Sequence, residues 1–88
     1  MLAYLVEFIG TFLFLSVILS NGKNPIAIAV ALLAAIYFGG AISGGHFNPA
    51  VSFMMFLSKS ITMQKLLGYV IVQLLGGAGA LYFSKLNK

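Results

Sequence analysis

The middle of the chain contains the sequence Ser43-Gly44-Gly45-His46-Phe47-Asn48-Pro49-Ala50-Val51-Ser52, followed by a short apolar run that ends at Leu57. Asn48 is typical of a helix N-cap. Pro49 is typical of the first helical residue, because the N–H that proline lacks has no partner within the helix at that position. The run 50–57 is too short to cross a bilayer, which takes roughly 17–25 residues. Residues 43–57 are therefore either an interfacial linker or a glycine-rich loop and half-helix that enters the membrane and stops midway. The glycines favour the second interpretation, because non-helical backbone at membrane depth must be buried by protein or lined by water.

The composition of the whole chain indicates a membrane protein. Of 88 residues, 61% are hydrophobic and 7% are charged, whereas a soluble domain has about 25% charged residues. Apolar segments of 18 residues each cover 2–19, 25–42 and 66–83, and each is long enough to span. We therefore expect an all-α membrane fold with three transmembrane helices and one re-entrant half-helix. Residues 1–88 form a single domain in this prediction, and the protein is a multi-pass integral membrane protein of the cell membrane.

Several functional classes are excluded by the residues that are missing or rare. The chain has no cysteine, one acidic residue (Glu7) and one histidine (His46). An acid/base pair, a catalytic triad and a metal centre each need more groups than these. We expect no enzyme activity, no metal and no cofactor. The net charge of +4 comes from scattered lysines, so no basic patch for nucleic acid is expected.

The Asn48 side chain combines two hydrogen-bonding roles in this interpretation. Its carboxamide oxygen caps the half-helix, which leaves the NH₂ donors directed outward with the positive end of the helix dipole. The preceding residues Gly44, Gly45 and His46 are expected to be extended and to present backbone carbonyl acceptors. Donors at the end of a row of acceptors suit a path for water or a small alcohol. The alternative is that Asn48 merely begins a surface helix.

Residues 43–52 resemble the signature of the aquaporin or major intrinsic protein family. The sequence Glu7-Phe8-Ile9-Gly10-Thr11 is similar to the acidic motif of the family's first helix, and Gln73 falls where its third helix carries a glutamine. The order of span, span, re-entrant loop and span resembles the family's N-terminal half-repeat. The resemblance implies a passive channel for water or small neutral solutes such as glycerol. It also implies which residues form the pore (Asn48, Pro49, Ala50, Gly44, Gly45, His46, Ile28 and Val51) and which support the loop (Glu7 and Gln73).

The chain departs from the family in having one Asn-Pro-Ala sequence, whereas the family has two inverted halves. A second half is therefore expected from another copy or from a complementary partner. In the family's orientation, Lys59, Lys65 and the N-terminal amine share one side, and Lys23, Lys85 and Lys88 lie on the other. An excess of lysines on one side of the membrane sets the orientation of a chain. The two sides carry equal numbers here, so the chain could insert both ways, as an antiparallel homodimer requires. The alternatives are a balance that arises by chance, and a truncated, non-conducting half-channel from a longer product.

The absence of arginine bears on selectivity. In the family, the half that resembles this chain has Val after Asn-Pro-Ala, as at Val51, while the other half supplies an arginine to the outer filter. The second filter position implied by the resemblance, Ile28, is aliphatic. A homodimer would therefore have a less cationic and wider filter.

Glu7 and His46 also carry alternative interpretations. Glu7 in a short, charge-balanced chain also fits a dual-topology exporter that couples protons to a cationic drug. His46 is expected to act mainly through its backbone carbonyl, although an imidazole near neutral pH also suits a pH gate. Three tyrosines near the ends of predicted spans are expected to anchor at the membrane interface: Tyr4, Tyr69 and Tyr82.

Overall fold

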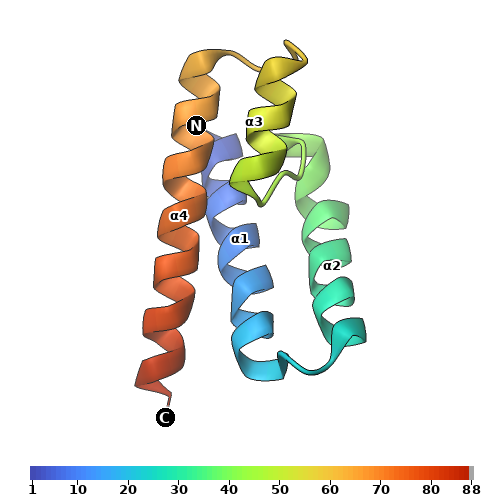
Figure 1. Cartoon of the computed structure of the whole chain (residues 1–88), viewed down its shortest axis with the longest axis vertical. Helices are drawn as coiled ribbons and strands as arrows, with labels where there is room; N and C mark the ends of the chain where they lie inside the picture. Colours follow the sequence, from blue (N-terminus) through green and yellow to red (C-terminus); the bar gives the residue numbers. More distant parts are fainter. Residues whose placement is uncertain (88) are drawn as a thin grey trace.

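The computed structural model describes residues 1–87, and these fold into helices joined by short connections (Figure 1). Their bounds are α1 Leu2–Asn21, α2 Pro25–Ser43, α3 Pro49–Leu57 and α4 Met63–Leu86. Helices α1, α2 and α4 are long and apolar enough to cross a membrane, and α3 is a short helix of nine residues. The predicted fold class, three spanning helices with one half-helix, is confirmed.

Helices α2, α3 and α4 each begin with a side-chain cap, whereas α1 begins after Met1 without one. Asn24 caps α2 by accepting a hydrogen bond from Ala27 N at 3.1 Å, and Thr62 caps α4 by accepting one from Lys65 N at 3.1 Å. Asn48 does the same for α3 through Ala50 N at 2.8 Å. Because the side-chain oxygen satisfies an amide that the helix cannot, each cap fixes where its helix begins.

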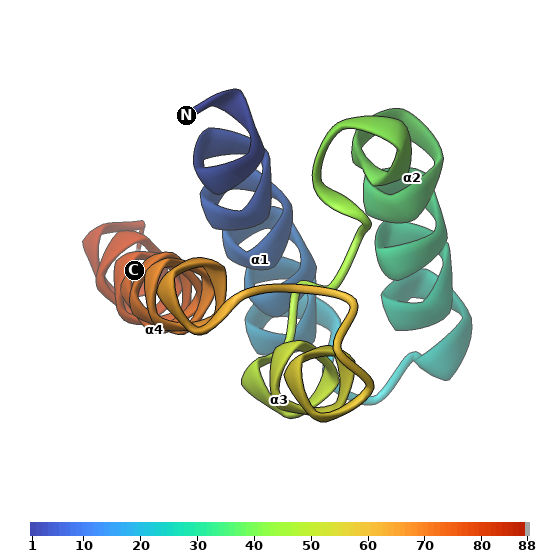
Figure 2. The same cartoon turned by 90° about the horizontal axis from the view of Figure 1, so that it is seen from above.

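Helix α1 lies between α2 and α4, and α3 covers the front of the bundle (Figures 1 and 2). One stripe of α4 is buried, at the three- and four-residue spacing of a single helix face: Leu66, Tyr69, Gln73, Gly76 and Ala80. A Cβ added at Gly76 would lie 3.0 Å from the carbonyl oxygen of Phe8 and 3.1 Å from Thr11 Cβ. Small residues thus let α4 approach the backbone of α1, as in other membrane helix pairs.

The re-entrant segment turns back into the bundle at the end of α2. Helix α2 ends at Gly44, whose φ of 93° reverses the chain and whose N–H donates to Gly40 O at 2.8 Å. The connection then descends, and α3 begins near the middle height of the bundle and rises to the turn before α4 (Figure 1). A nine-residue helix spans about 13 Å, so α3 fills only one half of the front.

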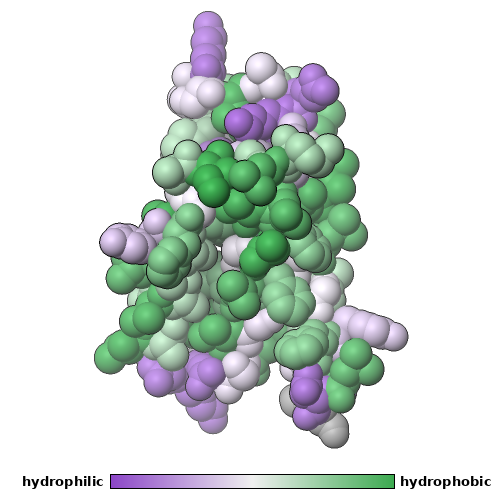
Figure 3. Space-filling view, turned by 180° about the vertical axis from the view of Figure 1, so that it is seen from behind, coloured by the Kyte–Doolittle hydropathy of each residue, from purple (hydrophilic) through white to green (hydrophobic). Residues whose placement is uncertain are grey.

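The face of the molecule seen in Figure 3 has an apolar belt between two polar ends. Large apolar side chains such as Leu33, Leu67 and Leu74 are exposed in the described part of the chain. Lys59 and Lys65 lie at the end that holds the N-terminus, and Lys23 and Lys85 lie at the opposite end. The predicted position of Lys88 lies outside the described residues. The belt is the surface that lipid chains cover in a spanning protein.

Candidate functional site

A buried carboxylate holds the re-entrant loop. Glu7 is 0% exposed, and its Oε2 accepts hydrogen bonds from Ser43 Oγ at 2.7 Å and from His46 N at 3.0 Å. Its Oε1 accepts from Phe47 N at 2.7 Å and from Gln73 Nε2 at 2.9 Å. The two backbone N–H groups can only donate, so both oxygens of Glu7 serve as hydrogen-bond acceptors. Within residues 1–87 no ion pair involves Glu7, and hydrogen bonds alone offset its burial.

The loop directs its amides inward and leaves its carbonyls free. Besides the two amides bound by Glu7, Gly44 N donates to Gly40 O, and Gly45 N donates to Ser43 Oγ at 3.1 Å. In the described part of the chain, no hydrogen bond reaches the carbonyl oxygens of residues 44–47. Buried backbone groups are nearly always paired. These oxygens are therefore the groups of the loop that remain available to a solute.

The Phe47 ring anchors the loop between α1 and α2. Phe47 has a left-handed φ of 51° and is 2% exposed. A Cβ added at Gly10 would overlap the ring, and one at Gly39 would lie 3.5 Å from its Cζ atom. Sequence reasoning missed this contact, although Gly10 follows Glu7 by three residues and therefore shares its helix face.

The tip of α3 presents hydrogen-bond donors. Asn48 is exposed, and its Oδ1 is occupied by the Ala50 amide of the cap. Its Nδ2 has no partner among residues 1–87. Pro49 is half-buried and Ala50 is exposed. The NH₂ group of Asn48 thus lies at the positive end of α3, which carries about half an elementary charge.

A second polar contact joins the loop to α3 and α4. Ser52 is fully buried, and its Oγ accepts from Gln73 Nε2 at 2.9 Å and lies 2.8 Å from His46 Nδ1. The sequence analysis did not identify Ser52, although it lies one helical turn after Asn48 within the ten-residue signature.

The predicted interfacial role of Tyr69 is wrong. Tyr69 is 0% exposed, and its hydroxyl donates to the carbonyl oxygen of Ser43. Its ring lies edge-on to the His46 ring, with centroids 5.0 Å apart. Because Tyr69 precedes Gln73 by one helical turn, both side chains lie on the α4 face that meets the loop. That spacing was the signal available in the sequence.

The two predicted filter residues lie apart. Val51 is half-buried in the first turn of α3, beside the loop. Ile28 is half-buried in the first turn of α2, at the end of the bundle opposite the α3–α4 turn (Figure 1). The structure therefore brings Val51, but not Ile28, to the tip of α3.

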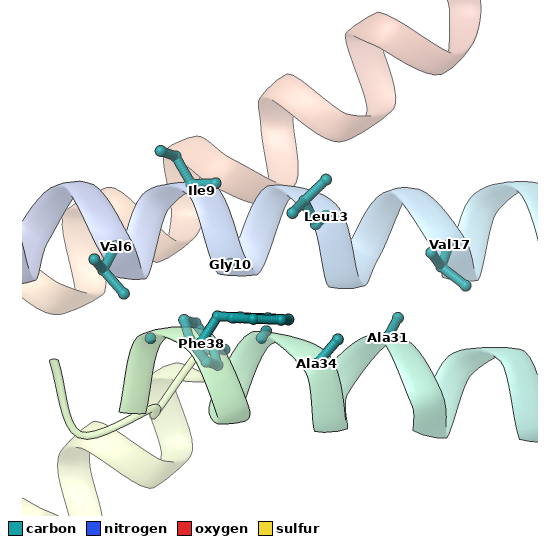
Figure 4. Close-up of a pocket in the computed structure, with 11 residues that line it drawn as sticks. Val6, Ile9, Gly10, Leu13, Val17, Ala31, Ala34 and Phe38 are labelled. Carbon is teal, nitrogen blue, oxygen red and sulfur yellow. The ribbon is translucent and has the colours of Figure 1, made fainter. Parts of the chain in front are cut away.

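An open groove of about 330 Å³ separates part of α1 from α2 (Figure 4). Phe47 forms one wall, and the other lining residues are Val6, Ile9, Gly10, Leu13, Val17, Ala31, Ala34, Ala35, Phe38 and Gly39. Every lining side chain is apolar, so the groove offers a water molecule none of the side-chain partners that it needs. The polar loop, and not this groove, is the candidate site.

Comparisons with known proteins agree with this arrangement. Residues 1–87 match the family described as major intrinsic protein. The chain is 37% identical over 81 residues to glycerol uptake facilitator protein-like 6 of Lactiplantibacillus plantarum, which covers 83% of this chain and 38% of that protein. It is 35% identical over 99 residues to aquaporin PIP2-7 of Arabidopsis thaliana, which covers 94% of this chain and 35% of that protein.

The aligned segment covers most of this chain and a much smaller share of each relative. A third relative, probable aquaporin PIP1-5 of Arabidopsis thaliana, is 38% identical over 96 residues, covering 88% of this chain and 33% of its own length. The chain thus spans about a third of the length of the curated relatives that it matches. No solved structure matches it significantly. The family match over nearly the whole chain, together with three helices able to span a bilayer, shows that this integral membrane protein belongs to the major intrinsic protein family.

Proposed function

We propose that the chain forms half of a passive membrane channel for water or small neutral solutes such as glycerol. The observation that carries the proposal is the loop 44–47, whose amides are bound inward while its carbonyl oxygens are free. The printed names of the relatives, a glycerol uptake facilitator and aquaporins, support the same class of solute.

The proposed path runs along the loop to the tip of α3. A hydroxyl group of the solute donates in turn to the carbonyl oxygens of Gly44, Gly45 and His46. It then accepts from the Asn48 NH₂ group at the start of α3, where the sequence is Asn48-Pro49-Ala50. Such exchange replaces the hydration shell of a neutral solute. The positive end of α3 repels cations and orients a file of water, which hinders proton transfer. Glu7 and Gln73 act by holding the loop.

Selectivity in this proposal follows from the filter positions Val51 and Ile28. Both side chains are aliphatic, and the chain has no arginine. A pore closed by a second copy would therefore have no cationic group at its narrowest part. Such a pore is expected to admit small alcohols as well as water, because it rejects solutes by width alone.

The proposed pore needs a second, inverted half. Helix α3 covers half of the front of the bundle (Figure 1). Without a partner, the free polar groups of the loop and of the α3 tip would meet lipid, at several kcal/mol each. The partner is a second copy in antiparallel orientation or a complementary half. Lysines at both ends of the bundle support the first option, because they give the chain no preferred orientation.

The proton-coupled exporter is disfavoured by the state of Glu7. Its carboxylate is fully buried, and both oxygens are saturated by donors. A coupling acid must exchange protons with water, and this one has no exposed surface in the part of the chain that is described.

Osmotic shrinkage of liposomes containing the purified chain tests the proposal. We expect fast, solute-dependent shrinkage that does not require a pH gradient, compared with protein-free liposomes of the same lipid. Transport that occurs only with an imposed pH gradient would favour the exporter. Shrinkage no faster than in empty liposomes would favour the truncated, non-conducting half.

A further inference from the structure

We propose that Ser52 is a positioning residue that fixes His46 as the neutral tautomer with its proton on Nε2. The buried cluster that carries this inference consists of Glu7, Gln73, Ser52 and His46, linked in that order by hydrogen bonds of 2.9, 2.9 and 2.8 Å. Ser52 is 0% exposed, so its hydroxyl must find its partners within this cluster, and His46 is 7% exposed.

The direction of each bond follows from the carboxylate. Oε1 and Oε2 of Glu7 each face a backbone N–H, which can only donate. The Gln73 group that approaches Glu7 is therefore its NH₂, and the same NH₂ donates to Ser52 Oγ. Ser52 Oγ has one hydrogen of its own, and in residues 1–87 the only remaining partner for it is His46 Nδ1. Nδ1 thus accepts, and a neutral imidazole with an accepting Nδ1 carries its proton on Nε2.

The opposite direction of the same bonds is less favourable. It requires a protonated Glu7 that donates to an inverted Gln73 amide, with His46 Nδ1–H donating to Ser52. The Gln73 NH₂ would then occupy the present position of Oε1, which is buried and has no partner. Two unsatisfied buried donors would replace one unsatisfied acceptor, and each such group costs free energy.

The other titratable groups around His46 leave this assignment unchanged. Tyr69 of α4 is engaged through its hydroxyl with a backbone carbonyl, and Lys65 Nζ lies 5.5 Å from the Tyr69 ring centroid. Tyr4 of α1 also contacts the Tyr69 ring, with centroids 5.6 Å apart. Tyr37 of α2 is 79% exposed, and α3 has no titratable side chain. None of these groups makes a hydrogen bond to the imidazole within residues 1–87.

The consequence concerns regulation, and it rests on the proposed function. The neutral imidazole lies within the loop, and its Nε2 would be 3.2 Å from a Cβ added at Gly44, an exposed residue of the proposed path. A proton gained at Nδ1 would place a positive charge beside that path. Because Ser52 occupies Nδ1, permeation stays independent of pH across the range in which a free imidazole changes charge, about pH 5 to 8.

The single histidine of the chain permits a direct test. The full chain is prepared in bilayers with ¹⁵N-labelled histidine, and its two ring nitrogens are followed by NMR. We expect one unprotonated nitrogen, assigned to Nδ1 by its couplings to the ring carbon-bound protons, and one protonated nitrogen, both unchanged from about pH 8 to about pH 5. A proton on Nδ1, or a doubly protonated ring, at neutral pH in the wild-type chain would overturn the inference without any variant.

Variants of Ser52 distinguish the effect of its hydroxyl group from a general loss of folding. Ser52→Ala should lose the single tautomer and gain a second ring proton on acidification, whereas Ser52→Thr, which keeps the hydroxyl, should restore the wild-type signals. Ser58→Ala is the matched control, because Ser58 is exposed and its hydroxyl bonds, within residues 1–87, to Met55 and Ser60. Unchanged signals in Ser52→Ala would contradict the role of Ser52.

Liposome shrinkage measured over the same pH range distinguishes failure of the proposed channel from failure of the proposed role of Ser52. The expected tautomer without solute flux would refute the channel and leave the role of Ser52 intact. Solute flux with the opposite tautomer would refute the role of Ser52 and leave the channel intact.

Discussion

At the scale of single residues, the carboxylate of Glu7 replaces the water that two loop amides would otherwise need. It is fully buried and binds the N–H groups of His46 and Phe47 together with two side chains. A carboxylate is suited to this position because it accepts on both oxygens and donates nothing. Neither an amide nor a protonated acid has that property.

We therefore expect Glu7→Gln to destabilise the loop. In either orientation of the new amide, its NH₂ group faces a backbone N–H, and each buried donor left unpaired costs about 1–3 kcal/mol. The unfolding midpoint in detergent should fall, while Gln64→Ala, at an exposed position of α4, should leave it nearly unchanged. Equal midpoints for all three proteins would show that the carboxylate contributes nothing to loop stability.

Asn48 allows stability and permeation to be separated. Asn48→Asp keeps the oxygen that caps α3 and adds a charge favoured at a helix N-terminus, so stability should be unchanged or higher. Because the NH₂ donors are lost and a negative charge appears, glycerol and water flux should fall and cation leakage should rise in liposomes. Asn24→Asp is the matched control, since Asn24 also precedes a proline and caps α2. Equal flux in both variants would remove Asn48 from the proposed path.

At the scale of the elements, the re-entrant segment is fixed by apolar packing as well as by hydrogen bonds. The Phe47 ring fills the space beside Gly10 of α1 and Gly39 of α2. Its left-handed backbone conformation is uncommon for a non-glycine residue. That conformation persists because the buried ring and the Glu7-bound amides of His46 and Phe47 both require it.

This packing predicts opposite effects for two glycine substitutions. Gly10→Ala places a methyl group inside the Phe47 ring, and such overpacking costs about 1–3 kcal/mol. Gly40→Ala meets only Ile36 Cγ2 at 3.6 Å, and alanine favours a helix by about 1 kcal/mol over glycine. Hydrogen exchange at the amides of residues 45–47 should accelerate in Gly10→Ala and not in Gly40→Ala. Similar exchange in both variants would contradict the anchoring role of Phe47.

The elements were more predictable than the contacts between them. Segment length and hydropathy indicated the spanning helices, and Asn48-Pro49 indicated where α3 begins, because both signals are local. The meeting of Ser52 with the imidazole of His46, and of Tyr69 with the end of α2, depends on how α4 rotates about its axis. That rotation is set by packing on α1 through Gly76, and one sequence without its fold does not reveal it.

At the scale of the whole molecule, the bundle fills only half of the membrane thickness on the side of α3. Three helices are long enough to cross the membrane, whereas α3 begins near the middle height of the bundle, with Asn48 exposed at its tip (Figure 1). Lysines occupy both ends of the bundle. An inverted copy would bring a second tip to the same depth and would place equal ends on opposite membrane faces.

Crosslinking of single-cysteine variants tests that arrangement, and the chain supplies no competing thiol. Ala50→Cys, exposed at the tip of α3, should link one copy to another in membranes. Lys59→Cys should not, because in inverted copies this turn lies on opposite membrane faces. Links at Lys59 alone would indicate parallel copies, and no link at Ala50 would favour a complementary partner half.

The hydrogen bond between Glu7 and Gln73 joins residues 66 positions apart, and this separation constrains the order of biosynthesis. A nascent chain that has released α1 and α2 already carries the loop, yet it lacks one of the donors that orient the Glu7 carboxylate. Ser52 also lacks its Gln73 partner until α4 emerges from the ribosome. We therefore expect residues 44–57 to reach their final position only after α4 has been inserted.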